Sequence, residues 1–191
     1  MKPTVFAAAL ALSTNMALAA PETYVLDASH SQVVFSYQHL GFSTTRGMFA
    51  GFGGEISFDQ DNPAASSVSV SMPVRSMMTG WEARFDHFMS DDFFGADEGD
   101  MISFTSTNIE VTGDNTANIT GDLTMNGTTK SVVLDAVLNK AGGHPMKDGQ
   151  EWAGFSATTT LLRSDYGLDM FAPFVSDEVE VEISIEAGKT E

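Results

Sequence analysis

Residues 41–58 read GFSTTRGMFAGFGGEISF, and this stretch indicates the fold more strongly than any other part of the chain. Phe52, Ile56 and Phe58 keep a two-residue alternation, whereas four glycines interrupt it at positions 47, 51, 53 and 54. Strand side chains point to alternate faces, and glycine tolerates the backbone angles that a sharply bent strand requires. A sheet that curls and closes around an apolar space needs such strands. The stretch therefore predicts one long bent strand of a barrel with an apolar interior.

Alternating apolar and polar residues recur along the rest of the chain. With the opening strand they give eight or nine strands, at residues 24–26, 31–37, 68–72, 102–111, 117–125, 132–138, 155–161 and 178–186. The alternation changes phase between Phe104 and Ile109, which indicates a bulge or turn. Asn126-Gly127 between two alternating runs is a strong hairpin signal. One apolar and one polar side, joined by short turns, predicts an all-β antiparallel sheet that buries a single face.

Residues 79–89, TGWEARFDHFM, depart from the strand pattern. Thr79 and Glu82 have the spacing of a capping box, which predicts that a helix begins at Thr79. Its aromatic residues Trp81, Phe85 and Phe88 share one stripe, and Arg84 and His87 flank that stripe. Such a helix either plugs one barrel end with its aromatic side chains in the core, or forms a gate whose Arg84 and His87 meet a polar ligand head. The two interpretations are compatible.

The composition excludes several classes of function. The chain has 26 acidic and 9 basic residues, a net charge of −17, so it lacks the clustered basic residues that bind nucleic acid and it should avoid anionic lipid surfaces. It has no cysteine, which excludes disulfides, thiol catalysis and cysteine-based metal sites. No repeat or linker divides residues 20–191, and their number fits a single domain.

The N-terminal residues have the pattern of an export signal. Lys2 precedes a short apolar run at residues 5–12, and Ala17-Leu18-Ala19 provides a small-x-small cleavage site. We therefore expect residues 1–19 to be a cleaved signal peptide, with a mature periplasmic protein that begins at Ala20. The apolar run is too short to span a bilayer, so we expect no stable membrane insertion.

Eleven short motifs follow one another in an order that resembles the YceI-like family over roughly residues 24–187. They are Asp27-Ala-Ser-His30-Ser, Gln38-His-Leu-Gly41, Arg46-Gly-Met-Phe49, Arg84-Phe-Asp-His87, Ser90-Asp-Asp-Phe-Phe94, Ile102-Ser-Phe-Thr-Ser106, Gly121-Asp-Leu-Thr124, Asn126-Gly-Thr-Thr-Lys130, Ala153-Gly-Phe-Ser156, Arg163-Ser-Asp-Tyr-Gly167 and Ser176-Asp-Glu-Val179. The resemblance implies an extended eight-stranded antiparallel lipocalin-like β-barrel with a short helix near one end. It also implies a periplasmic carrier that encloses a long-chain isoprenoid or similar amphipathic lipid, such as a ubiquinone-like or polyprenyl molecule.

We expect two groups of side chains to contact such a ligand. The apolar lumen would be formed by Phe35, Tyr37, Phe49, Phe52, Trp81, Phe85, Phe88, Met89, Phe93, Phe104, Met125 and Phe155. The polar head would be positioned by Asp27, His30, His39, Arg84 and His87. Phenylalanine and methionine suit an adaptable apolar wall, although the same residues could also fill a solid core.

Other functions have weaker support in the residues. The four histidines show neither His-x-His nor His-Glu-x-x-His spacing, so we expect no metal site; His30, His39 and His87 would be the set to consider. There is no Gly-x-Ser-x-Gly motif and no cofactor motif, so we expect a binding protein that is not an enzyme. An enzyme acting on an isoprenoid head group and a ligand-free, stress-related barrel remain alternatives. Whether two copies form a homodimer stays open.

Overall fold

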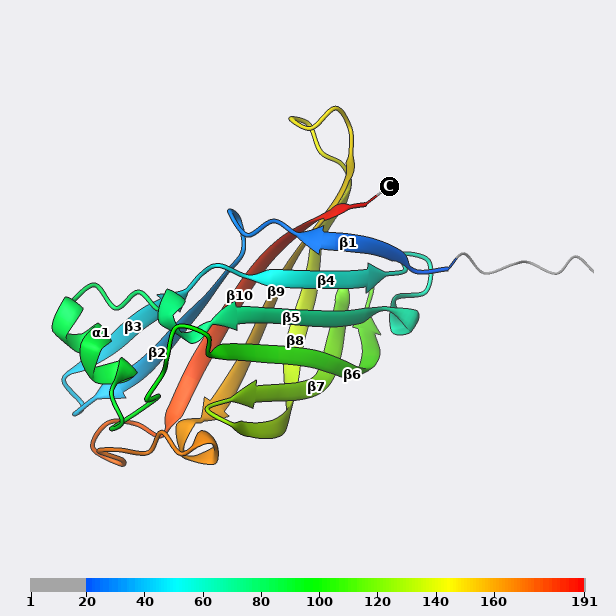
Figure 1. Ribbon diagram of the computed structural model, residues 1–191. Helices are drawn as coiled ribbons and strands as arrows, with labels where there is room; N and C mark the ends of the chain where they lie inside the picture. Colours follow the sequence, from blue (N-terminus) through cyan, green and yellow to red (C-terminus); the bar gives the residue numbers. More distant parts are fainter. Residues whose placement is uncertain (1–19, 191) are drawn as a thin grey trace, which may run out of the picture.

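The computed structural model describes residues 20–190, which form one antiparallel β-sheet accompanied by short helices (Figure 1). The strands are β1 Glu22–Leu26, β2 Gln32–His39, β3 Ser43–Phe49, β4 Gly53–Phe58, β5 Ser67–Pro73, β6 Met101–Gly113, β7 Thr116–Met125, β8 Thr128–Gly143, β9 Glu151–Leu162 and β10 Glu178–Lys189. The helices are α1 Glu82–Met89 and the 3-10 turns η1 Pro63–Ala65, η2 Val74–Ser76 and η3 Arg163–Tyr166. The predicted signal peptide, residues 1–19, lies outside the described residues.

The sheet closes into a barrel because β1 pairs with β4 on one side and with β10 on the other. The ring runs β1-β4-β5-β6-β7-β8-β9-β10, and the neighbouring strands are antiparallel. β2 pairs with β10 farther along, and β3 pairs with β2, so these two strands prolong the barrel at one end (Figure 1). The predicted eight-stranded antiparallel barrel is confirmed, with β1–β2 and β3–β4 each acting as one interrupted strand.

The bend predicted within residues 41–58 lies at residues 50–52, between β3 and β4. Gly51 has a φ of 70° and Gly54 a φ of 127°, angles that side chains rarely tolerate. A Cβ atom on Gly54 would also lie 2.2 Å from the carbonyl oxygen of Ser69 on β5. The hinge lets the chain leave its pairing with β2 and begin pairing with β1 and β5. The predicted single strand is therefore two strands, because the hinge residues leave the ladder.

Three further sequence predictions are confirmed. The β6–β7 register shifts between Ser106 and Asn108, where the phase of the alternation changes. Asn126 and Gly127 connect β7 to β8, with Met125 paired with Thr128 across the turn. The apolar residues of β10 alternate toward the barrel interior while Glu178, Glu180 and Glu182 are exposed.

The predicted start of the helix is wrong. Helix α1 begins at Glu82, and its N-cap residue Trp81 has an extended backbone with no side-chain cap. The Thr79 hydroxyl donates instead to the carbonyl oxygen of Trp81, 2.8 Å away. Because Trp81 precedes the helix, it does not continue the stripe of Phe85 and Phe88 into the core, and its side chain is 63% exposed.

Helix α1 lies at the end of the barrel that β2 and β3 prolong (Figure 1). The ring of Phe88 on α1 lies 6.3 Å from the ring of Tyr37 on β2, measured between centroids. Just before the helix, Met78 exchanges two backbone hydrogen bonds with Met48 on β3, of 2.7 and 3.0 Å. The helix therefore covers this end of the barrel while the strands form its wall. None of the helices in residues 20–190 combines the length and apolar character needed to cross a bilayer.

Aromatic rings pack against one another where β1 and β4 meet the end of β10. The Tyr24 and Phe58 rings pack edge to face with centroids 5.7 Å apart, and Phe58 packs in the same way on Phe155 at 5.5 Å. Ala153 on β9 and Ala187 on β10 are fully buried beside them. Small residues at these positions let the walls approach closely there. The barrel is thus packed on one side and open along the rest of its axis.

Candidate functional site

The interior of the barrel encloses a cavity of about 770 Å³. Inward side chains of β2 through β10 form its wall, together with α1 and the segment that connects η3 to β10. On β10 the wall residues are Val179, Val181, Ile183 and Ile185, every second residue of the strand. Because strand side chains alternate between faces, this periodicity places aliphatic groups inward and glutamates outward. The barrel is therefore hollow, and the solid core that the sequence also allowed is not formed.

The two ends of the cavity differ in their polar groups. Near α1 the wall includes His39, Arg84 and His87. At the opposite end it includes the turn between β6 and β7, with Asp114 and Asn115. Asp114 is the one carboxylate among the described residues that line the cavity. A neutral apolar passage thus connects a cationic end with an end that carries a carboxylate and an amide.

A cluster of aromatic rings lines the cavity at the α1 end. The Phe93 ring lies 5.2 Å from Phe88 and 5.0 Å from His87, and it lies 6.4 Å from Phe171 on the η3–β10 segment. His87 Nε2 also contacts Asp92 Oδ2 at 3.3 Å. The histidine ring is therefore held among aromatic neighbours at the mouth of the cavity.

Arg84 is positioned by contacts on its own side of the mouth. Its guanidinium donates from Nη1 to the carbonyl oxygen of Thr79 at 3.1 Å and lies 5.8 Å from the Trp81 ring centroid. The guanidinium of Arg84 therefore lies beside the mouth of the cavity. Within residues 20–190, its hydrogen bond goes to a backbone carbonyl oxygen and not to a carboxylate. An uncompensated guanidinium at this position can meet a polar or anionic group of a ligand.

Arg163, which directly follows β9, holds in place the segment between η3 and β10 that lines the cavity near α1. Its Nε donates to the Ser176 carbonyl oxygen at 2.8 Å, and Nη1 and Nη2 donate to the carbonyl oxygens of Met170 and Val175 at 2.8 and 2.9 Å. Nη1 also donates to the Leu168 carbonyl oxygen. Burial lowers the pKa of Arg163, although the charges of Asp177 and Asp169 oppose this shift. The side chain therefore acts as a structural clamp for residues 168–176.

Ten of the twelve predicted apolar residues line the cavity: Phe35, Tyr37, Phe49, Phe52, Trp81, Phe88, Phe93, Phe104, Met125 and Phe155. The structure places the other two elsewhere. Phe85 lies half-buried with its ring 5.4 Å from the Arg75 guanidinium, and Met89 is buried in the packed core.

The structure separates the predicted polar residues into two groups. His39, Arg84 and His87 line the cavity, whereas Asp27 and His30 lie in the loop between β1 and β2, outside its wall. Asp27 Oδ1 accepts from the Ser29 amide at 3.0 Å and the Ser29 hydroxyl at 2.5 Å, and Oδ2 lies 3.1 Å from His30 Nδ1. The hydrogen bond from Ser29, followed by that with His30, lowers the pKa of Asp27 well below its usual range. Asp27 therefore shapes a turn.

The same loop is tied to the hairpin between β8 and β9. Lys147 Nζ lies 3.6 Å from Asp27 Oδ2 and 3.9 Å from the centroid of the Trp152 ring. The indole of Trp152 donates to Glu186 Oε2 at 3.1 Å. No group of three or more histidine and carboxylate side chains within residues 20–190 has the geometry to hold a metal ion, so His30, His39 and His87 do not form one.

Several wall residues were not predicted. Some lie on strands whose alternation already indicates the inward face: Ile56, Phe58, Ile109, Val132, Leu134, Leu138 and Leu161. Extending the pattern along each strand would have found them. Phe171 and Val175 come from the irregular segment between η3 and β10, which carries no periodic signal.

Both the fold and the amino-acid sequence are similar to those of known proteins. Residues 24–187 match the profile of the YceI-like domain. A UPF0312 protein of Pseudomonas putida is 38% identical over 178 residues, which cover 93% of this chain and 91% of the relative.

Two solved structures have a similar fold. The YCEI protein of Campylobacter jejuni is 30% identical, with a TM-score of 0.71 over 81% of this chain and 90% of that one. A polyisoprenoid binding domain from Saccharophagus degradans, implicated in plant cell wall breakdown, has a TM-score of 0.66 and 15% identity over 87% of this chain and 98% of that one. At 15% identity the likeness shows the fold alone. The profile match and the 38% identity extend over nearly the whole chain, and the chain therefore belongs to the YceI-like domain family.

Proposed function

We propose that this protein is a binding or carrier protein for a long-chain isoprenoid or similar amphipathic lipid of the quinone or polyprenol type. The cavity is the observation that carries the proposal: about 770 Å³ enclosed mainly by Phe, Met, Leu, Ile and Val side chains. Small-molecule sites are typically cavities of ~300–1,000 Å³ with apolar walls and a few convergent polar groups. Binding is non-covalent, and the proposal includes no chemical step on the lipid.

The apolar wall accounts for the affinity. Burial of one methylene contributes ~0.8 kcal/mol, so a five-carbon isoprene unit contributes roughly 3–4 kcal/mol before costs. Association costs ~4–15 kcal/mol in lost translational and rotational freedom, which two to four buried units offset. Head-group contacts then set orientation and selectivity more than affinity, and chains of different lengths are accepted.

The polar head lies at the α1 end in this proposal. Arg84 is the cation at that mouth, with His39 and His87 beside it, whereas Asp114 lies at the opposite end. A quinone carbonyl oxygen can only accept hydrogen bonds, so it is attracted to the guanidinium and repelled by the carboxylate, and a prenol hydroxyl can also accept from the guanidinium. The tail then extends away from α1 along the strands.

Two further observations support a lipid as the first ligand class to test. The Saccharophagus degradans domain that shares this fold is a polyisoprenoid binding domain. The N-terminal residues 1–19 have the features of a signal peptide, so we place the protein in the periplasm, where a lipid tail must be shielded from water. The mass of the mature protein from its own host tests the cleavage before Ala20.

The proposal is tested with the full-length gene expressed in its own host. Native mass spectrometry and organic extraction of the purified protein should reveal a bound lipid close to one per chain. The delipidated protein should take up a long-chain ubiquinone or a long-chain polyprenol from detergent solution. An empty protein that also takes up neither lipid would refute the proposal.

A pair of neighbouring positions on β8 provides a matched control. Leu134 lines the cavity, whereas Val133 is exposed on the opposite face of the strand. Leu134→Asp should reduce lipid uptake more than tenfold because it places a carboxylate against the tail, and Val133→Asp should leave uptake unchanged. Ala157→Phe, which adds an apolar ring to the wall, keeps the test valid if Leu134→Asp fails to fold. It should shift the preference toward shorter tails.

A further inference from the structure

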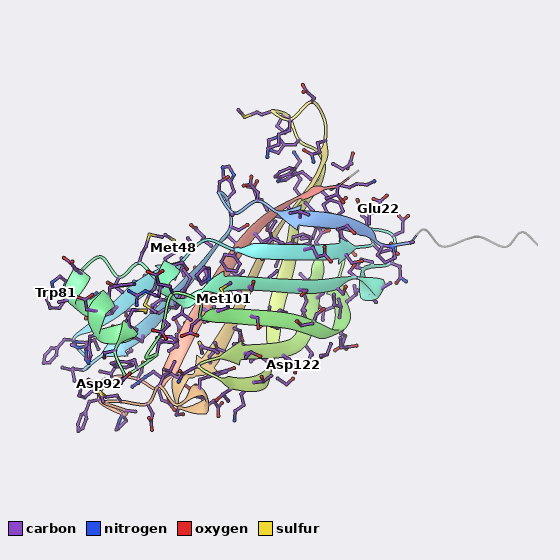
Figure 2. All side chains as sticks on the ribbon, in the orientation of Figure 1. Glu22, Met48, Trp81, Asp92, Met101 and Asp122 are labelled. Atoms are coloured by element: carbon purple, nitrogen blue, oxygen red, sulfur yellow. The ribbon has the colours of Figure 1, made fainter. Side chains whose placement is uncertain are left out.

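The solvent-facing side chains at the α1 end are largely apolar. We define the aromatic rim as Leu40 and Phe42 in the β2–β3 turn, Trp81 before α1, and Phe171 and Phe174 between η3 and β10. These five side chains are between 49% and 88% exposed. Figure 2 shows Trp81 at this end of the molecule, opposite Glu22 at the start of β1.

The three segments that carry the rim contact one another. The Leu40 amide donates to the Phe174 carbonyl oxygen at 2.9 Å, and His39 forms a β-bridge with Val175. The His87 ring on α1 lies 6.2 Å from the Phe171 ring. The β2–β3 turn and the η3–β10 segment are therefore joined directly, and helix α1, which follows Trp81, contacts the second of them through His87.

The rim also borders the cavity. Trp81 and Phe171 line the cavity and are exposed at the same time, whereas Phe42 and Phe174 are exposed without lining it. Since an aromatic side chain has ~150–250 Å² of surface, the exposed part of the rim amounts to about 500 Å². The largest apolar patch on a typical monomer covers ~300–600 Å² and is often functional, so the rim has the size of a functional apolar patch.

We infer that the aromatic rim docks onto the surface of a bilayer of zwitterionic phospholipids, with the mouth of the cavity against the acyl chains. This inference rests on the proposed function, because a lipid tail can pass between a bilayer and the cavity without crossing water only if the mouth touches the bilayer. Aromatic side chains on loop tips are the groups that partition into the headgroup region.

The charge distribution selects zwitterionic lipids over anionic ones. The chain carries a net charge of −17, and such a surface is repelled by an anionic bilayer. The four lysines of the described residues lie on β8, on the loop after it and on β10, and none belongs to the segments that form the rim. Near the rim, Asp86, Asp91 and Asp92 add negative charge beside Arg84 and His87. The exposed apolar side chains of the rim are then the groups expected to contribute most to binding, with the guanidinium of Arg84 beside Trp81.

The test uses the complete mature protein and vesicles of pure phosphatidylcholine. Wild-type protein should float with these vesicles and transfer a long-chain ubiquinone from loaded to empty ones. The double variant Phe42→Ser with Phe174→Ser should lower vesicle binding and transfer by at least tenfold, because each ring leaves an apolar interface. Its uptake of ubiquinone from detergent solution should equal that of wild type, since neither ring lines the cavity.

Met146→Ser is the matched control, since Met146 and Phe42 are each 88% exposed and Met146 lies on the β8–β9 loop. It should bind vesicles as wild type does. Vesicles of phosphatidylglycerol should bind the protein less well at low salt, and added salt should reduce that difference.

The outcomes separate this inference from the proposed function. Uptake of ubiquinone from detergent without binding of wild type to phosphatidylcholine vesicles overturns the docking inference alone. Vesicle binding that depends on Phe42 and Phe174, in a protein whose cavity takes up no lipid, overturns the proposed function and supports the rim as a docking surface. A wild-type dimer in sedimentation velocity that the double variant dissolves, without vesicle binding, assigns the rim to a second copy and overturns the inference.

Discussion

The hinge between β3 and β4 predicts a sharp difference between two adjacent glycines. Gly53 and Gly54 both lie on β4, but only Gly54 has a positive φ, of 127°. A Cβ atom on Gly54 would lie 2.2 Å from the Ser69 carbonyl oxygen and 2.7 Å from the Cα atom of Val70. A Cβ atom on Gly53 would meet nothing within 4 Å. Alanine at Gly54 should therefore destabilise the barrel strongly, and alanine at Gly53 should not.

The size of the effect follows from three contributions. A side chain held in a sparsely populated positive-φ conformation costs ~1–3 kcal/mol. Contacts of a Cβ atom below 3.0 Å essentially do not occur, so β4 and β5 must separate, and each weakened ladder hydrogen bond costs ~1 kcal/mol. Replacing glycine with alanine restricts the unfolded chain and returns ~0.4–1 kcal/mol. The net loss for Gly54→Ala is about 2–4 kcal/mol. For Gly53→Ala, the unfolded-chain contribution alone predicts a change within about 1 kcal/mol.

Equilibrium urea unfolding of both variants and the wild type measures these changes. Tryptophan fluorescence and far-ultraviolet circular dichroism should give coincident transitions, and the m-value should stay constant. Thermal unfolding of Gly54→Ala should have a midpoint lower by about 5–15 °C, because 1 kcal/mol corresponds to ~2–4 °C for a domain of this size. If Gly54→Ala is as stable as Gly53→Ala, the interpretation that glycine at position 54 is required for β4 to pair with β5 just after the hinge is refuted.

Two other substitutions test the loops at opposite sides of the barrel. Arg163→Lys should lower the free energy of unfolding by about 3 kcal/mol, because one ammonium cannot satisfy the carbonyl oxygens that the guanidinium holds. The same change should speed proteolysis within residues 167–177. Unchanged proteolysis would contradict the role of Arg163 as a clamp. Asp27→Asn should cost about 1 kcal/mol at neutral pH. Since folding lowers the pKa of Asp27, its contribution is complete above about pH 4 and is lost as the pH falls below that value. The difference in unfolding free energy between wild type and Asp27→Asn should therefore stay constant down to about pH 4 and shrink as the pH falls from about 4 toward 2 in urea titrations. A difference that grows as the pH falls would show that the sign is wrong.

The strands could be predicted because their signal is local. Alternation places Val179, Val181 and Ile183 on one face wherever β10 pairs, and a barrel with one apolar face must turn that face inward. Likewise, the glycine at position 54 indicates a bend by its residue type alone, and no knowledge of the neighbouring strands is needed. For this reason the chain alone, or its resemblance to the family, was enough to predict the all-β class, the hinge and the Asn126-Gly127 hairpin. It was also enough to predict ten of the twelve apolar wall residues.

The tertiary structure decided which polar residues meet at the cavity. Asp27 and His30 lie within a motif that suggested a head-group site, yet their hydrogen bonds close a local turn and β1 directs that turn away from the interior. Phe171 and Val175 reach the cavity only because Arg163 gathers four carbonyl oxygens of an irregular segment. Local sequence determines the periodicity of a strand, whereas the path of a loop depends on contacts between residues far apart in the chain. That is the physical reason why the strand residues of the wall could be predicted and the residues of the η3–β10 segment could not.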